Sequence, residues 1–253
     1  MLNIGVAQTK NTNDYQSNFI QIFDFLKRFE QTNVDLILFP ECSLSGFTSK
    51  NKDCTLDLLE QYFEPIEAWS VLNNKTVILP TAIVEDKIYN SGYVFSRGNR
   101  SRFYKHGLTK SEQNYFSVPN SIPSKIYELN GYRFALLICF EAQLDPYSYF
   151  KAGEVDFILW PGYWGWTLND NWSAFKNGSE ENLVFKNMQQ WKVPLIQANF
   201  SRNGDGLPNP GPQGLSVVVD HNNELIWRGD FEAESAFIVT LDKKSVKAVE
   251  FIC

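Results

Sequence analysis

The sequence is poor in the residues that hold metal ions or build disulfide frameworks. Its 253 residues include two histidines, His106 and His221. The four cysteines are Cys42, Cys54, Cys139 and Cys253. Neither the C-x-x-C nor the H-E-x-x-H spacing of zinc sites occurs. We therefore expect no metal, no cofactor, and cysteines that stay reduced, as is typical of a cytoplasmic protein.

Long hydrophobic runs and basic clusters are also missing. Phe134–Phe140 is among the longest apolar runs and is far too short to span a membrane. The chain opens MLNIGVAQ, without the basic and apolar regions of a secretion signal. The formal net charge is −6, and no block is rich in lysine or arginine. These features argue against nucleic acid or a membrane as the main partner.

What is present is a regular succession of short apolar segments and segments with helical spacing. Strands are expected at Leu2–Gln8, Asp35–Phe39, Thr76–Val84, Ile88–Phe95, Arg100–Tyr104, Lys125–Leu129, Gly131–Ile138, Asp156–Trp160, Val193–Ala198, Leu215–Val219, Glu224–Trp227 and Ala236–Leu241. Helices are expected around Phe19–Phe29 (capped by Asn13), and at Leu56–Leu72, Asp145–Lys151 and Ser179–Trp191. Without a linker or repeat, this order favours one α/β domain over residues 1–253, with a mixed sheet or two stacked sheets covered by helices.

Three functional groups follow directly after separate predicted strands: Glu41, Lys105 and Cys139. Each alone has an ordinary explanation, as a solvated loop carboxylate, a surface lysine and a cysteine packed in the core. Together they form a chemical set. A carboxylate can take the proton of a thiol, and an ammonium can stabilise the oxyanion that forms when the sulfur attacks a carbonyl carbon. The three groups therefore suffice for acyl transfer through a thioester.

Three phrases around these residues resemble the signatures of the nitrilase superfamily, the carbon–nitrogen hydrolases. They are FPE at Phe39–Glu41, FYKHGL at Phe103–Leu108 and LICFEAQLDP at Leu137–Pro146. Their order and the separation of Lys105 from Cys139 match the family. The segments IGVAQ, SEQNYF, LIQANFSRNG and GLSVVVD also have counterparts there, so the resemblance extends over nearly the whole chain.

The resemblance implies an αββα sandwich of two mixed β-sheets covered by helices, and assembly into a homodimer or a higher homo-oligomer. It also implies Glu41 as general base, Cys139 as nucleophile and Lys105 as the group that stabilises the tetrahedral intermediate. The backbone N–H of Phe140 would be a second donor to the oxyanion. Glu112 matches a further family glutamate that would hold the lysine or assist proton transfer, although a surface carboxylate is the alternative.

The sequence departs from the family pattern beside these residues. The family usually has histidine two residues after the lysine, where this chain has Gly107, and His106 is shifted by one position. The residues after the cysteine are often Tyr-Asp or Glu-Asp, and here they are Phe140-Glu141. The departures leave open how the triad is supported locally and which substrate is preferred.

Aromatic and polar residues near the signatures are candidates for the walls of a substrate pocket. The candidates are Phe140, Glu141, Tyr115, Tyr163, Trp164 and Asn199. Trp164 could equally belong to the core, because aromatic side chains line both pockets and cores. Arg202 could bind a substrate carboxylate, with an ordinary surface arginine as the alternative.

Glu41, Lys105 and Cys139, together with the family resemblance, predict a cysteine-dependent hydrolase of a non-peptide C–N bond. The substrates would be water and a small amide or N-carbamoyl compound, and the products would include ammonia or an amine. The alternatives are a nitrilase that acts on a small nitrile, a catalytically inactive binding or scaffold protein of the same fold, and transfer of the acyl group to an acceptor other than water.

Overall fold

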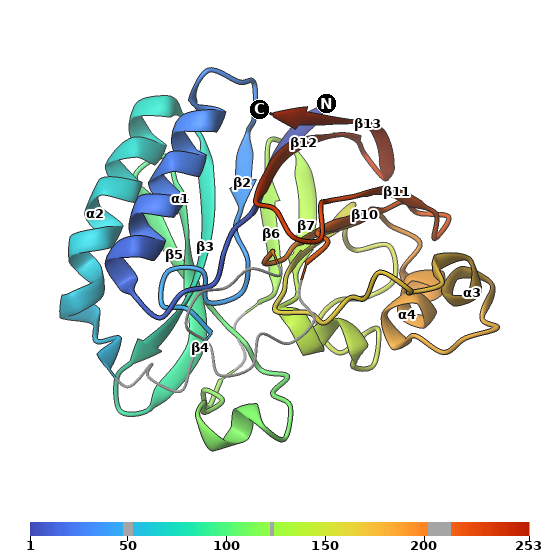
Figure 1. Ribbon diagram of the computed structural model, residues 1–253, viewed down its shortest axis with the longest axis horizontal. Coiled ribbons are helices and arrows are strands. Elements are labelled where there is room, and N and C mark those ends of the chain that lie inside the picture. The colour runs from blue at the N-terminus through green and yellow to red at the C-terminus, as the bar shows by residue number, and fades with distance from the viewer. Residues whose placement is uncertain (48–52, 122–123, 202–213, 253) are drawn as a thin grey trace.

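Two β-sheets lie face to face in the computed structural model, which describes residues 1–47, 53–121, 124–201 and 214–252, and helices cover their outer faces (Figure 1). The first sheet has the strand order β13-β12-β1-β2-β3-β4-β5. Its strands are β1 (Leu2–Gln8), β2 (Leu36–Leu38), β3 (Thr76–Val84), β4 (Ile88–Ser96), β5 (Asn99–Tyr104), β12 (Ser235–Asp242) and β13 (Ser245–Ile252). Strands β1, β2 and β3 are parallel, and the other pairs are antiparallel.

The second sheet has the order β11-β10-β9-β8-β7-β6 and is likewise mixed. Its strands are β6 (Ile126–Leu129), β7 (Tyr132–Leu136), β8 (Phe157–Pro161), β9 (Leu195–Ala198), β10 (Val217–Val219) and β11 (Leu225–Arg228). The central strands β7, β8 and β9 are parallel, and antiparallel strands flank them on both sides. The expected sandwich of two mixed sheets is therefore confirmed.

Helices α1 (Tyr15–Glu30) and α2 (Leu56–Asn73) cover the first sheet (Figure 1). The apolar spacing of α1 buries Ile22, Leu26 and Phe29. Its N-cap is Asp14, whose side chain accepts from the backbone N–H of Ser17, and not Asn13 as the sequence suggested. Either residue type can cap a helix, so the neighbouring sequence could not distinguish them.

Helices α3 (Trp172–Asn177) and α4 (Leu183–Trp191) cover the second sheet. The helix predicted at Asp145–Lys151 was wrong, because this segment forms turns. The Asp145 side chain accepts from the N–H of Tyr147, and its carbonyl accepts from the N–H of Ser148. Pro146 favours the second position of such a turn.

The sandwich has three apolar layers. One layer lies between α1, α2 and the first sheet, and another lies between α3, α4 and the second sheet. The central layer joins the inner faces of both sheets, with Ile4 and Leu38 from one sheet and Phe134 and Leu136 from the other. This central layer fixes the distance between the sheets, and with it the distance between groups at their strand ends.

The edge at which β2, β5 and β7 end carries the predicted functional groups. Glu41 follows β2 after two residues, Lys105 follows β5 directly, and Cys139 follows β7 after two residues. Since β5 is two antiparallel pairings away from β3, it runs in the same direction as the parallel strands β2 and β3. One edge of the sandwich can thus collect all three groups.

Candidate active site

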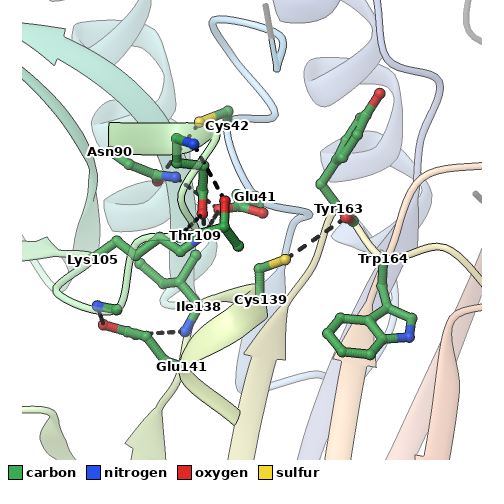
Figure 2. Close-up of polar contacts among 12 residues, drawn as sticks. Glu41, Cys42, Asn90, Lys105, Thr109, Ile138, Cys139, Glu141, Tyr163 and Trp164 are labelled. Atoms are coloured by element: carbon green, nitrogen blue, oxygen red, sulfur yellow. Dashed lines mark hydrogen bonds and ion pairs between the residues drawn. The ribbon is translucent and has the colours of Figure 1, made fainter. Parts of the chain in front are cut away.

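Glu41, Lys105 and Cys139 come from three segments that converge at this edge (Figure 2). The Lys105 ammonium donates to Glu41 Oε1 at 2.6 Å and to Glu112 Oε1 at 2.5 Å. Lys105 and Glu41 are fully buried, and Glu112 is nearly so. Buried charges require partners of opposite sign, and here one ammonium stands between two carboxylates.

Glu112 is fixed in turn by the segment just before it. Its Oε2 accepts from the backbone N–H of Thr109 at 2.8 Å, and the Thr109 hydroxyl accepts from the N–H of Glu112 at 3.3 Å. One carboxylate oxygen therefore anchors the loop while the other holds Lys105. The structure places Glu112 beside the lysine, and not at the surface.

Asn90 is a residue of the site for which sequence reasoning gave no indication. Its side-chain amide donates to Glu41 Oε1 at 2.7 Å, and its backbone carbonyl accepts from the N–H of Lys105 at 2.8 Å. Its side-chain oxygen lies 3.6 Å from the sulfur of Cys42, which donates to it. Asn90 is fully buried inside β4. A buried amide within an apolar strand was the available signal, because such a group needs partners.

The two oxygens of Glu41 have different surroundings. Oε1 accepts from both Lys105 and Asn90. Oε2 is buried and has no hydrogen-bond partner among the described residues. Burying an acceptor without a partner is unfavourable, and such atoms concentrate where a substrate or a proton will be bound. Oε2 is therefore the oxygen available to accept a proton.

Cys139 opens a short 3₁₀-helix, Cys139–Gln143, which we call the Cys139 turn. Its backbone has the positive φ of 48°, which is uncommon for a residue other than glycine and indicates local strain. Its carbonyl accepts from the indole N–H of Trp160 at 2.8 Å, and its sulfur lies 3.7 Å from the carbonyl oxygen of Tyr163. The backbone N–H of Phe140 lies in the first turn of this helix, where N–H groups lack intrahelical partners.

Burial and charge set the protonation states. Burial raises the pKa of the Cys139 thiol well above its ordinary value, and the Glu41 carboxylate adds to this rise. Burial also raises the pKa of Glu41, and the charge of Lys105 opposes that rise. For Lys105, burial alone would lower the pKa, but Glu41 and the neighbouring acidic groups raise it above its ordinary value. Lys105 thus stays an ammonium, and Cys139 rests as a thiol beside a carboxylate of increased basicity.

A cavity of about 530 Å³ opens beside Cys139. Its lining comprises Thr109, Cys139, Phe140, Gln143, Tyr163, Trp164, Gly165, Trp166, Asp170, Phe175 and Asn182. The predicted pocket residues Phe140, Tyr163 and Trp164 belong to this lining. The volume suits a small organic molecule.

The remaining predicted pocket residues lie elsewhere. Tyr115 is 51% exposed and is not part of this lining. Asn199 is fully buried behind the cavity, where its side chain accepts from the backbone N–H of Trp164 and donates to the Trp164 carbonyl. Glu141 belongs to the Cys139 turn, and its buried carboxylate accepts from backbone N–H groups. Arg202 lies outside the described residues.

Two further properties concern the described residues only. They contain no group of three or more histidine, cysteine, aspartate or glutamate side chains that could hold a metal ion. None of their helices combines the length and the apolar character needed to cross a membrane.

With this geometry established, comparison with known proteins gives the class. The family model for carbon–nitrogen hydrolases matches residues 3–251, and the chain belongs to that family. Comparison with curated protein sequences gives no match.

Solved structures share the fold. An amidase from Nesterenkonia sp. AN1, in a mutant form that carries acrylamide joined by Michael addition at its active-site cysteine, aligns with a TM-score of 0.79 at 17% identity, over 96% of this chain and 94% of that one. A mutant of the same amidase in complex with butyramide gives a TM-score of 0.77 at 17% identity, over 95% and 90% of the two chains.

A protein of the carbon–nitrogen hydrolase superfamily from Xanthomonas campestris, XC1258, has an arsenic adduct in its active site. It aligns with a TM-score of 0.76 at 16% identity, over 95% of this chain and 90% of that one. At such low identities these likenesses establish the nitrilase-superfamily fold of the present chain, and the molecules bound in those structures describe those proteins.

The role of Asn90 can be tested through the pH dependence of activity. A donor to a carboxylate stabilises its charged form, so Asn90→Ala should raise the pKa of Glu41 further. On acidification, a reaction that needs ionised Glu41 would then lose activity at a higher pH in the variant than in the wild type. We expect the acidic limb of kcat/KM to move upward in Asn90→Ala, measured on any substrate that is turned over.

Ser91→Ala is the matched control. Ser91 is the next residue of β4 and is equally buried, and its hydroxyl donates to the Phe103 carbonyl and accepts from Arg102 Nε. Its acidic limb should coincide with that of the wild type. Coinciding limbs in wild type and Asn90→Ala would show that Asn90 does not tune Glu41.

Proposed function

We propose that the protein is an amidase that hydrolyses a small amide through a thioester on Cys139. The observation that carries this proposal is the buried ion-pair set of Lys105, Glu41 and Glu112, next to a cavity that Cys139 lines. The family membership and the amidases among the structural neighbours support it.

In the first half of the proposed reaction, the Cys139 sulfur attacks the amide carbon while its proton passes to Glu41 Oε2. The new C–S bond places a negative charge on the former carbonyl oxygen. Two of the three N–H donors of Lys105 are used by Glu41 and Glu112, so the third can bind this oxyanion together with the backbone N–H of Phe140. When the C–N bond breaks, Glu41 returns the proton to the leaving nitrogen, and ammonia or an amine departs.

In the second half, a water molecule attacks the thioester and gives its proton to Glu41. The tetrahedral intermediate again places its charge between Lys105 and Phe140. Breaking the C–S bond releases the carboxylic acid and returns the proton to the sulfur. The sum is one amide and one water converted into one acid and one ammonia or amine, and the side chains are regenerated.

The lining of the cavity favours an amide without a negative charge. Among the described residues of the lining, Asp170 is the one carboxylate, and none is a lysine, arginine or histidine. An N-carbamoyl amino acid would bring a carboxylate near Asp170 without a cationic partner in the described lining. We therefore rank an uncharged small amide above an N-carbamoyl amino acid as substrate.

The first test is ammonia release from a panel of primary amides, N-carbamoyl amino acids and simple nitriles. Wild type should turn over at least one amide and form an acyl adduct that intact-mass measurement detects. Cys139→Ala should show neither. Glu41→Gln and Lys105→Ala should each lower the rate at least ~10²-fold while keeping the fold, as expected of base and oxyanion groups. Wild-type turnover in either variant would refute its role.

The same panel separates the alternatives. Turnover of nitriles without amides would indicate a nitrilase. Amide consumption that yields a hydroxamate when hydroxylamine is added would reveal transfer to acceptors other than water. Silence across the panel together with an unreactive Cys139 would indicate a binding protein that has kept the fold.

The charge preference has its own test. Within a matched pair of amides of equal length, the one that ends in a carboxylate should have a kcat/KM at least about 10-fold below that of the uncharged one, because like charges repel in a partly dry cavity. Asp170→Asn should narrow this ratio. An equal or inverted ratio in the wild type would overturn the preference, and would direct attention to Arg202.

A further inference from the structure

A second buried ion pair, Lys125 with Glu141, lies next to the triad and takes no part in the reaction as proposed. The Lys125 ammonium donates to Glu141 Oε2 at 2.9 Å. The exposed fractions of the two residues are 2% and 1%, so this pair is as dry as the catalytic one. Neither residue lines the cavity beside Cys139. Removing one partner of such a pair would leave an uncompensated buried charge, and the contacts of the pair show which segments it joins.

The Glu141 carboxylate helps to fix the backbone conformation around Cys139 by a hydrogen bond to the residue before it. Its Oε2 accepts from the backbone N–H of Ile138 at 2.7 Å, and the backbone N–H of Glu141 donates to the Ile138 carbonyl at 3.0 Å. The residues enclosed by these two hydrogen bonds are Cys139 and Phe140, which carry the nucleophile and the second oxyanion donor. Because Cys139 has a positive φ, its conformation needs such a constraint from its surroundings.

The same carboxylate reaches the segment that carries Lys105. Glu141 Oε1 accepts from the backbone N–H of His106 at 2.6 Å and from that of Gly107 at 3.3 Å. Lys125 adds a second link, since its ammonium also donates to the carbonyl of Tyr104. The residues on both sides of Lys105 are thus tied to the residues on both sides of Cys139, although Lys105 follows a strand of the first sheet and Cys139 follows a strand of the second.

The unusual glycine after the lysine fits this arrangement. A Cβ atom at position 107 would lie 2.6 Å from Leu144 Cδ1 and 3.0 Å from Glu141 Cγ. Glu141 therefore occupies the space that a larger residue would need. Gly107 contributes its backbone N–H to Glu141 Oε1 but has no side chain that could carry a charge, and the charge that balances the carboxylate comes from Lys125.

Burial and mutual attraction act in opposite directions on the pKa values of the Glu141 carboxyl and the Lys125 ammonium. Burial would raise the pKa of Glu141, but Lys125 and the backbone N–H groups of Ile138 and His106 lower it. Burial lowers the pKa of Lys125, and Glu141 opposes this. His106, whose ring is also close to Glu141, has a pKa lowered by burial, so it stays neutral and does not replace Lys125 as the counterion.

From these contacts we infer that Lys125 and Glu141 are positioning residues that hold the Cys139 turn and the Lys105 segment in register across the two sheets. This inference rests on the proposed function for its kinetic consequences. A misplacement of about 1 Å between reacting groups costs on the order of 10²-fold in rate. Removing the contacts of Lys125 or Glu141 should therefore lower kcat and leave KM nearly unchanged, because neither side chain lines the cavity.

The experiment compares Glu141→Gln and Lys125→Met with Lys125→Arg and with a matched control. Lys75 is the control because it is also a buried lysine, and its ammonium donates to the carbonyls of Phe29, Glu30 and Thr32 at the end of α1, away from the site. Lys75→Met should cost stability and leave kcat at the wild-type value at temperatures where it is folded.

Two readouts are measured on each variant well below its melting temperature: kcat and KM on an amide, and the rate at which iodoacetamide alkylates Cys139 at neutral pH, read by peptide mass. Glu141→Gln and Lys125→Met should lose on the order of 10²-fold in kcat with KM changed less than about 2-fold. Their alkylation of Cys139 should slow about as much as in Glu41→Gln, because the thiol no longer faces its base. Lys125→Arg, which keeps the charge, should restore both rates to within a few-fold of the wild type.

Wild-type kcat and alkylation in Glu141→Gln would overturn the inference, as would an equal loss in Lys75→Met, which would reduce the effect to general stability. If Glu141→Gln does not fold, Glu141→Asp decides. Its shorter carboxylate keeps the charge but cannot reach both backbone segments, so the same loss supports the inference and wild-type rates overturn it. If the wild type turns over no amide, the alkylation rates alone decide, so this inference and the proposed function can fail separately.

Discussion

The site depends on one interaction, the ammonium of Lys105 enclosed between the carboxylates of Glu41 and Glu112 without access to water. Removing three charges from water is costly, and their mutual attraction offsets that cost only when the geometry is held tightly. The surrounding structure supplies this constraint through Asn90 on one side of Glu41 and through the Thr109 backbone behind Glu112. The apolar layer between the sheets keeps the site dry, and thereby keeps these interactions strong.

Much of the site could be predicted because its main groups follow recognisable strands. Glu41, Lys105 and Cys139 stand just past apolar segments, where side chains of an α/β sheet gather, and the family signatures add Glu112. The sandwich fold followed from the same signatures. The last strand, β13, was missed because Lys247 and Glu250 interrupt the apolar residues of Ser245–Ile252 without a regular alternation, and the segment lacks a continuous apolar run.

The supporting residues could not be predicted, because their roles depend on side-chain direction at turns. Glu141 stands two residues after Cys139 and was expected to face the substrate, but the Cys139 turn directs its carboxylate toward backbone N–H groups. Asn199 also faces the backbone, of the Trp164 segment. Lys125 lies far from the signatures in sequence, and only the pairing of β6 with β7 brings its segment beside β7. The spacing of residues along the sequence does not predict such contacts.

In the proposed reaction, the buried ion pairs explain how the Cys139 thiol, despite its raised pKa, can serve as a nucleophile. Three carboxylates, Glu41, Glu112 and Glu141, face two ammonium groups, so the site carries one net negative charge while Cys139 is a thiol. Ionising the thiol in isolation would add a second negative charge to a dry site, which is why burial and Glu41 raise its pKa. In the proposed reaction, transfer of the proton to Glu41 during attack would move the single negative charge to the oxyanion beside Lys105, and its return to the leaving nitrogen would move the charge back. The net charge then stays constant through the proposed cycle, so a rigid, preorganised environment can stabilise every step.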